Sequence, residues 1–285
     1  MVAEETAKTS TNARIGISIM NYETPQFSTD ELTAYINQNR LLRSGADNVK
    51  LAKSDAIGEY LTYNLSLMPW KYSGFQTCPM GQDCHLDCIG HKSGNNVFKT
   101  TQLAKIKRTQ AFFKIRPEFM RVLREDIEKI YYTPSPHSMA VRLNTYSDIP
   151  WEEYGIVDAY PGIMFYDYTK LFSRVSIRTC HRENYDLTYS LSALRHNLDA
   201  IQGLNGHNRL AMVVSRPVYK SIRQTYLSGT DSFTYKGVTF YNGELHDLTF
   251  KYPKKGVLIL KEKYVKTPQA PNPLVYRSLD QIGLS

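Results

Sequence analysis

The hydrophobic and polar positions of this chain repeat one pattern, in which a short apolar run is followed by a polar loop and a stretch with helical periodicity. This alternation is typical of βα units around a parallel sheet. Six parallel strands are predicted at residues 60–68, 139–143, 163–166, 187–190, 209–215 and 257–260. The expected fold class is α/β, either as a partial (β/α)6 TIM-like barrel or as a doubly wound sheet.

Helices are predicted before and between these strands. Ser28 and Glu31 have the spacing of a capping box, so a helix should begin there and end near residue 42. A longer helical stretch, interrupted before Pro117, covers residues 97–132. Further helices are expected at 150–158, 192–204 and 217–227, a hairpin at 234–241, and an additional alternating strand at 14–20.

No low-complexity linker divides the chain, so one barrel-like domain is expected over residues 14–266. Residues 1–13 are polar and lack periodicity, which indicates a disordered N-terminus. Residues 267–285 are rich in proline and asparagine and predict an extended C-terminal tail.

The composition narrows the class of protein. A chain of 285 residues with 42% hydrophobic content can bury a full core. It has no apolar run of about eighteen residues and no secretion signal at its start, so we expect a cytoplasmic protein without a membrane partner. The net charge of +8 is densest over 99–129 and 251–266. This excess would suit nucleic acid, although the first stretch is predicted to be helical and a charge-rich helix is usually a solvated face.

Three of the four cysteines, Cys78, Cys84 and Cys88, fall within eleven residues directly after the first predicted strand. Four cysteines are too few for a disulfide scaffold, whereas clustered thiols favour a soft metal centre. Three thiolates suit a [4Fe-4S] cluster with one iron left for another ligand. Zinc is the alternative metal, with His85, His91 or a distant side chain as fourth ligand. The isolated Cys180 is interpreted as incidental.

Polar residues that follow the other strands are candidates for catalysis, because the carboxyl ends of parallel strands form the site in both architectures. These candidates are Asn144, Asp148, Asp167, Lys170 and His246. Asn144 and Asp148 would line the metal site together with Arg142, unless they only form a strand-end turn. Asp167 and Lys170 would form an acid/base or anion-binding pair, or a surface ion pair.

His246 precedes Asp247, and a histidine held by a carboxylate can serve as a fourth metal ligand or a proton donor. A histidine in a turn is the simpler interpretation. The sequence contains no phosphate-binding Gly-x4-Gly-Lys-Ser/Thr loop, no Gly-x-Ser-x-Gly elbow and no His-Glu-x-x-His helix.

A three-cysteine loop after the first strand of a six-unit βα barrel resembles the radical S-adenosylmethionine enzymes. That resemblance implies S-adenosylmethionine as a second cofactor, bound to the open iron of the cluster. Those enzymes typically use Cys-x3-Cys-x2-Cys with an aromatic residue before the last cysteine, whereas this chain has Cys-x5-Cys-x3-Cys with Leu86 and Asp87 before Cys88. Their glycine-rich run after the second strand is replaced here by residues 144–148.

Residues 64–261 resemble the phage gene product 88 family, which is carried by phages and plasmids. The shared segments are Asn64-Leu65-Ser66, Arg108-Thr109, Arg142-Leu143-Asn144, Ser147-Asp148-Ile149, Trp151-Glu152, Phe165-Tyr166-Asp167-Tyr168-Thr169-Lys170, Tyr185, Leu187-Thr188-Tyr189-Ser190, Gly243-Glu244 and His246-Asp247. The resemblance implies a phage origin, hence the host cytoplasm, and a barrel with a metal-binding loop, but no particular reaction.

The first hypothesis is therefore a phage-type iron-sulfur protein that binds its cluster through Cys78, Cys84 and Cys88. It would act as an iron-sulfur oxidoreductase or a radical enzyme, with an electron donor or a small-molecule substrate as partner. The alternative is a zinc-binding phage protein that binds or processes nucleic acid. A third hypothesis is an inactive barrel in which the metal only folds the loop.

Overall fold

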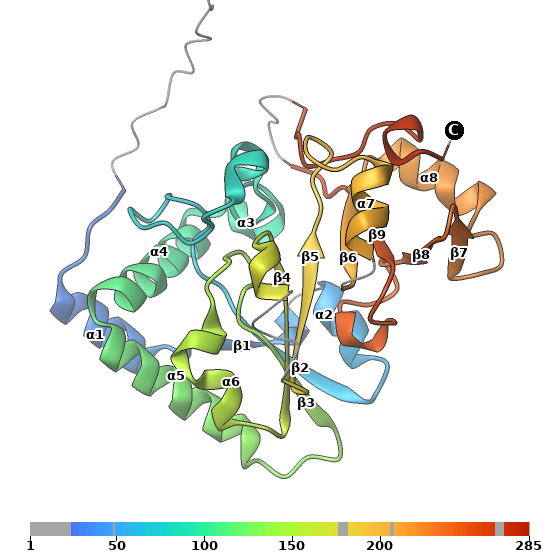
Figure 1. Cartoon of the computed structure of the whole chain (residues 1–285). Helices are drawn as coiled ribbons and strands as arrows, with labels where there is room; N and C mark the ends of the chain where they lie inside the picture. Colours follow the sequence, from blue (N-terminus) through green and yellow to red (C-terminus); the bar gives the residue numbers. More distant parts are fainter. Residues whose placement is uncertain (1–23, 48, 176–181, 206–207, 266–270, 285) are drawn as a thin grey trace, which may run out of the picture.

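A nine-stranded, mostly parallel sheet forms the centre of the computed structural model, which describes residues 24–284 except 48, 176–181, 206–207 and 266–270 (Figure 1). The strands are β1 (Leu42–Ser44), β2 (Tyr60–Leu65), β3 (Ser138–Arg142), β4 (Ile163–Thr169), β5 (Tyr185–Ser190), β6 (Leu210–Val214), β7 (Ser232–Tyr235), β8 (Val238–Asn242) and β9 (Val257–Lys261). Their order in the sheet is β1-β2-β3-β4-β5-β6-β9-β8-β7. The α/β class predicted from the sequence is confirmed.

Six consecutive parallel strands, β2 to β6 and β9, correspond to the six that the apolar runs predicted. The hairpin β7–β8 is also present, and β8 joins β9 in parallel, which extends the sheet on that side. The short strand β1 pairs antiparallel with β2 at the opposite edge and was not predicted. The described sheet thus ends in two edge strands, β1 and β7, and is open.

The helices are α1 (Thr29–Gln38), α2 (Val49–Asp55), α3 (Ile89–Lys92), α4 (Lys99–Lys114), α5 (Arg116–Tyr131), α6 (Ile156–Ala159), α7 (Leu198–Asn205) and α8 (Arg216–Thr225). Ser28 and Glu31 form the predicted capping box at the start of α1. The predicted interruption separates α4 from α5, where Ile115 leaves helical geometry and a proline stands in the first turn of α5. Helix α7 begins later than predicted, because residues 192–197 are not helical and include a turn at 193–195.

The two faces of the sheet differ in what covers them. Residues such as Val141, Phe165 and Leu187 pack on one face against helices, including Phe119 and Leu123 of α5, in the main hydrophobic core. The intervening residues point to the other face, as strand geometry requires. There, Ala140 and Tyr166 pack against Leu51 of α2 and against Leu248, which lies between β8 and β9.

The buried side chain of Arg209 holds neighbouring segments against this second face of the sheet. Arg209 is fully buried, and its Nη1 lies 2.5 Å from Asp186 Oδ1. Its other nitrogens donate to the carbonyl oxygens of Tyr252 and Pro253 at 2.8 and 2.9 Å. Because a buried guanidinium must be paired to offset its lost hydration, these bonds hold the segment before β9 against the sheet.

The described part of the predicted C-terminal tail lies against the core. The side chains of Val275, Tyr276, Ile282 and Leu284 are buried, and Tyr276 forms a parallel β-bridge with Val214 of β6. The strand predicted at 14–20 and the N-terminal segment 1–13 lie outside the described residues. Within the described part of the chain, no helix combines the length and apolar character needed to cross a membrane.

Candidate metal centre

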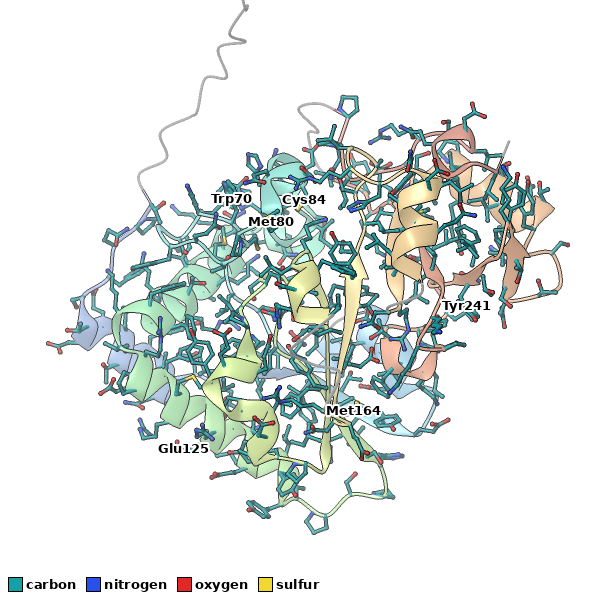
Figure 2. The ribbon with its side chains drawn as sticks, viewed as in Figure 1. Trp70, Met80, Cys84, Glu125, Met164 and Tyr241 are labelled. Carbon is teal, nitrogen blue, oxygen red and sulfur yellow. The ribbon has the colours of Figure 1, made fainter. Side chains whose placement is uncertain are left out.

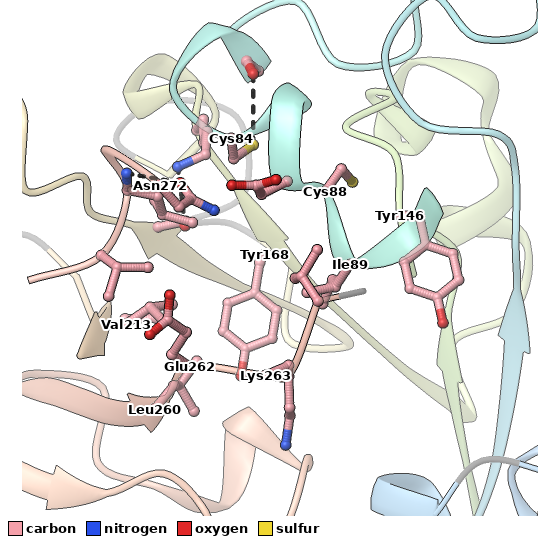
Figure 3. A pocket seen from close by; sticks show the side chains of 18 of the residues that line it. Cys84, Cys88, Ile89, Tyr146, Tyr168, Val213, Leu260, Glu262, Lys263 and Asn272 are labelled. Carbon is pink, nitrogen blue, oxygen red and sulfur yellow. Dashed lines mark hydrogen bonds between the residues drawn. The ribbon is translucent and has the colours of Figure 1, made fainter. Parts of the chain in front are cut away.

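The three cysteines of the loop after β2 border one cavity of about 820 Å³ at the carboxyl ends of the parallel strands. Figure 3 shows Cys84 and Cys88 on one side of this cavity, with Val213 of β6 and Leu260 of β9 across from them. The cavity, here called the cysteine pocket, is completed by Arg142, Lys170, Ser190, Glu244 and Asp247, by residues 262–265, and by Pro271, Asn272, Leu274, Val275 and Arg277. The cysteine loop thus lies at the carboxyl end of the first parallel strand, as the sequence predicted.

Short-range contacts shape the cysteine loop. Thr77 is fully buried and donates to Met68 O at 2.8 Å, while its carbonyl accepts from Asp148 N at 2.8 Å. These bonds tie the residue before Cys78 to both neighbouring loops. A Cβ at Gly81 would lie 3.0 Å from Cys78 Cβ, so the absence of a side chain there permits close approach of the two chain segments.

Burial favours the neutral form of all three thiols. Burial raises the pKa of Cys78 to about 12, with a smaller contribution from Cys84. Burial also raises the pKa of Cys88 to about 12, with further contributions from Cys84 and Cys78. The pKa of Cys84 is raised by burial too, and is lowered in part by Lys170. A negative charge on Cys84 would thus disfavour the thiolate forms of both Cys78 and Cys88.

The sulfurs have only weak partners. Cys78 Sγ donates to Tyr146 O at 3.3 Å and Cys84 Sγ to Gly81 O at 3.6 Å. Within the described residues, no group of three or more His, Cys, Asp or Glu side chains is arranged to hold a single metal ion. Cys180 lies outside the described residues.

The two histidines of the loop are engaged by aromatic rings. His85 stacks on Trp70 with ring centroids 4.7 Å apart, and His91 stacks on Tyr72 at 4.3 Å. Trp70, Met80 and Cys84 are seen at the same end of the molecule in Figure 2. Neither histidine belongs to the lining of the cysteine pocket, so each would need a side-chain movement to act as a fourth ligand.

Asn144 and Asp148 line the cysteine pocket, as expected, but both are used by the protein itself. Asn144 Oδ1 accepts from Ser147 Oγ, Ile149 N and Trp151 Nε1 at 2.8 to 3.1 Å. These bonds organise the turn after β3. Asp148 Oδ1 accepts from Arg174 Nη1 at 2.5 Å, and Asp148 Oδ2 accepts from Lys170 N at 2.9 Å.

Asp167 and Lys170 do not meet. Asp167 is fully buried and accepts from Asn144 N at 2.7 Å and from Tyr185 OH at 3.1 Å. Lys170 points into the cysteine pocket and donates from Nζ to Ser190 Oγ at 3.3 Å. Side chains three positions apart on an extended chain lie on opposite faces, which separates this pair. Burial lowers the pKa of Lys170, whereas Cys84 and two nearby carboxylates raise it.

His246 lies beside the site and not in its lining, since its ring packs against Tyr252 at 4.6 Å. The neighbouring Asp247 does line the pocket and pairs with Arg142. The sequence reasoning gave no role to Tyr168, over whose ring the Arg142 guanidinium lies at 4.8 Å. It also missed Arg174, which binds Asp148 and Glu152. Strand alternation could have indicated Tyr168, but no local signal marks Arg174.

The fold and the site define a mixed α/β protein with a cysteine-lined pocket at the carboxyl ends of a mostly parallel sheet. The family model described as Gene product 88 matches residues 33–269. The chain belongs to this family. Neither the curated proteins nor the solved structures with which the chain was compared give a match. The comparisons therefore support the predicted phage gene product family and lend no support to the resemblance to radical S-adenosylmethionine enzymes.

Proposed function

We propose that this protein binds a [4Fe-4S] cluster through Cys78, Cys84 and Cys88 at the rim of the cysteine pocket. The observation that carries the proposal is that all three thiols border one cavity, together with polar side chains from the ends of several strands. Three thiolates leave one iron of a four-iron cluster without a protein ligand. That iron would face the space in which a substrate or a further ligand binds.

The donor set fits a cluster better than a single zinc ion. Structural zinc needs four ligands around one point, and the two loop histidines are engaged in stacking outside the pocket lining. The ligands of a four-iron cluster bind different irons, so their sulfurs do not have to converge on one point. This agrees with three thiols around one cavity that are not arranged for a single ion.

Charge also fits. Metal ligation requires thiolates, so binding has to overcome the raised pKa of each buried thiol and release protons. Lys170 beside Cys84 and Lys105 beside Cys88 both favour the thiolate forms. These two lysines would balance part of the negative charge of the bound cluster.

A bound cluster would supply one-electron redox chemistry, and the chain's own groups would position the reacting molecule. Lys170 offers a positive charge, Tyr168 an aromatic wall, and Asp247 fixes the Arg142 guanidinium. We infer a redox role, with radical chemistry as its extension, an electron donor as partner and a small molecule as substrate. The consecutive order of the six parallel strands supports a partial barrel around this site.

The proposal is tested by purifying the full chain without oxygen. Expected are a brown protein, stoichiometric iron and inorganic sulfide, and an absorption that dithionite bleaches. Replacing Cys78, Cys84 or Cys88 singly by alanine should remove the iron, whereas Cys180→Ala should retain it. A colourless protein with stoichiometric zinc would overturn the proposal. In a separate arm, added S-adenosylmethionine should perturb the reduced cluster spectrum if radical chemistry occurs.

A further inference from the structure

We propose that a second, basic pocket between the end of β2 and the start of α4 binds a phosphate group. This cavity of about 400 Å³, here called the basic pocket, is bordered by Arg43, Asn64, Ser66, Lys105, Arg108 and the first turn of α4. Tyr146 contributes to the walls of both pockets, so they are neighbours. Lys105 lines the basic pocket and also lies beside Cys88, whereas Arg43 and Arg108 belong to the basic pocket alone.

Three cations line the basic pocket and no acidic residue does. None of the ion pairs in the described part of the chain includes Arg43, Lys105 or Arg108. Lys105 is 1% exposed and donates to Gly90 O and Asn96 Oδ1, both uncharged. Buried cations are normally paired, so the buried Lys105 and Arg108, neither of them in an ion pair and both beside the exposed Arg43, indicate an anionic ligand.

Arg108 gives the clearest indication that the basic pocket binds an anion. Its side chain is 6% exposed, its Nε donates to Ala104 O at 3.2 Å, and its Nη1 is buried without a hydrogen-bond partner. Burial lowers its pKa, Tyr35 raises it in part, and the charge of Arg43 lowers it. A buried guanidinium nitrogen without a hydrogen-bond partner destabilises the folded state. A bound oxyanion would accept a hydrogen bond from Nη1 or from Nη2 of the same guanidinium.

The start of α4 adds neutral donors. This sixteen-residue helix has no side-chain cap at Phe98 and no acidic residue in its first turn, and Thr100 and Thr101 line the pocket. The first amides of a helix lack internal partners and carry partial positive charge, which suits anions. Asn64 and Ser66 supply further hydrogen-bonding groups at the end of β2.

Phosphate matches this set better than a carboxylate does. A phosphate monoester carries up to two negative charges and presents several acceptor oxygens in a tetrahedral arrangement. Three cations, amides and hydroxyl groups on different sides of one cavity can engage those oxygens together. The phosphate could be free, part of a nucleotide, or part of a nucleic-acid chain, and the test separates these sources.

Binding of inorganic phosphate, adenosine monophosphate and a short 5′-phosphorylated single-stranded oligonucleotide to the full chain should be measured by calorimetry. At least one of them should bind with saturation, and the tightest identifies the source. Oligonucleotide binding through the backbone would also weaken as salt rises. No saturable binding of any of the three would overturn the proposal.

A matched pair of variants tests the location. Arg43 and Arg40 are both exposed and three positions apart, but only Arg43 lines the basic pocket. Arg43→Gln should weaken the binding about tenfold, because it removes a charged hydrogen-bond donor. Arg40→Gln should leave it within about twofold. Equal weakening by both would indicate a diffuse basic surface and overturn the proposal.

A third variant, Arg108→Lys, keeps the charge but loses the planar fork, and should also weaken binding. Thermal unfolding in each case shows whether the variant is folded. If Arg108→Lys does not fold, the comparison of Arg43→Gln with Arg40→Gln still decides the question.

Discussion

Arg142 Nη1 donates to Asp247 Oδ2 at 2.7 Å, and this bond joins two residues that are 105 positions apart in the sequence. The side chain of Asp247 is 2% exposed and that of Arg142 is 15% exposed. The pair links the end of β3 to the loop after β8 in the wall of the cysteine pocket. The charge of Asp247 keeps the pKa of Arg142 above its usual value despite burial.

Removal of the carboxylate should destabilise the fold. Asp247→Ala leaves the Arg142 guanidinium without its counter-ion, and we expect a loss of about 3–5 kcal/mol in the free energy of unfolding. Glu125 pairs with Arg121 on the surface and is 47% exposed, far from the cysteine loop (Figure 2). Glu125→Ala should cost less than about 1 kcal/mol. Urea unfolding of both variants tests this difference, and similar losses would contradict it.

Asn144→Asp should be destabilising in a pH-dependent way. The amide of Asn144 donates to Ile149 O at 2.8 Å and to Asp167 Oδ2 at 3.3 Å, and a carboxylate would lose both bonds and repel Asp167. We expect a loss of about 2–4 kcal/mol at pH 8 and a smaller loss at pH 5, where protonation relieves the repulsion. Ser147→Ala, which removes a single donor to Asn144, should cost about 1 kcal/mol.

Because of Asp167, the stability of the fold should decrease as the pH rises from about 4 to about 7. Burial raises the pKa of its carboxyl to about 7, against a value near 4 in the unfolded chain. In this window the folded state holds a proton that the unfolded state has released. The free energy of unfolding therefore falls by roughly 1 kcal/mol for each unit by which the pH rises. Above pH 7 the contribution is constant.

The measurement compares wild type with Asp167→Asn, because all other titrating groups then cancel. The free energy of unfolding of the wild type should fall relative to that of Asp167→Asn as the pH rises from 4 to 7. Above pH 7 the difference between the two should stay constant. A difference that does not change with pH would mean that the donors Asn144 and Tyr185 keep the carboxyl ionised.

Gly90→Ala should displace the helical turn after Cys88. A Cβ at Gly90 would lie 2.6 Å from Cβ and Cγ of Tyr146, closer than real contacts allow. We expect a loss of about 1–3 kcal/mol from this overpacking, and reduced metal content if the cysteines bind a cluster. Gly203 lies within α7 with open space around it, so Gly203→Ala should stabilise by about 0.5–1 kcal/mol. Unaltered stability and metal content in Gly90→Ala would contradict the prediction.

The sequence by itself determined the features that depend on local patterns. Apolar runs and intervening helical periodicity predicted the six parallel strands, because burial on both faces of a strand demands continuous hydrophobic residues. The capping box of Ser28 and Glu31 and the interruption near Pro117 follow from neighbouring residues alone. Cys78, Cys84 and Cys88 had to lie near one another, since the short chain between them limits their separation.

The tertiary structure decided which polar side chains share a cavity. The alternation of an extended chain sends Asp167 to the side of Asn144 and Lys170 into the cysteine pocket, although both follow one apolar run. Arg142 pairs with Asp247, and Arg43 lines one cavity with Arg108, only because strands and helices distant in the sequence pack together. Such contacts depend on the sheet order and on the facing of each element, which no local pattern of this chain encodes.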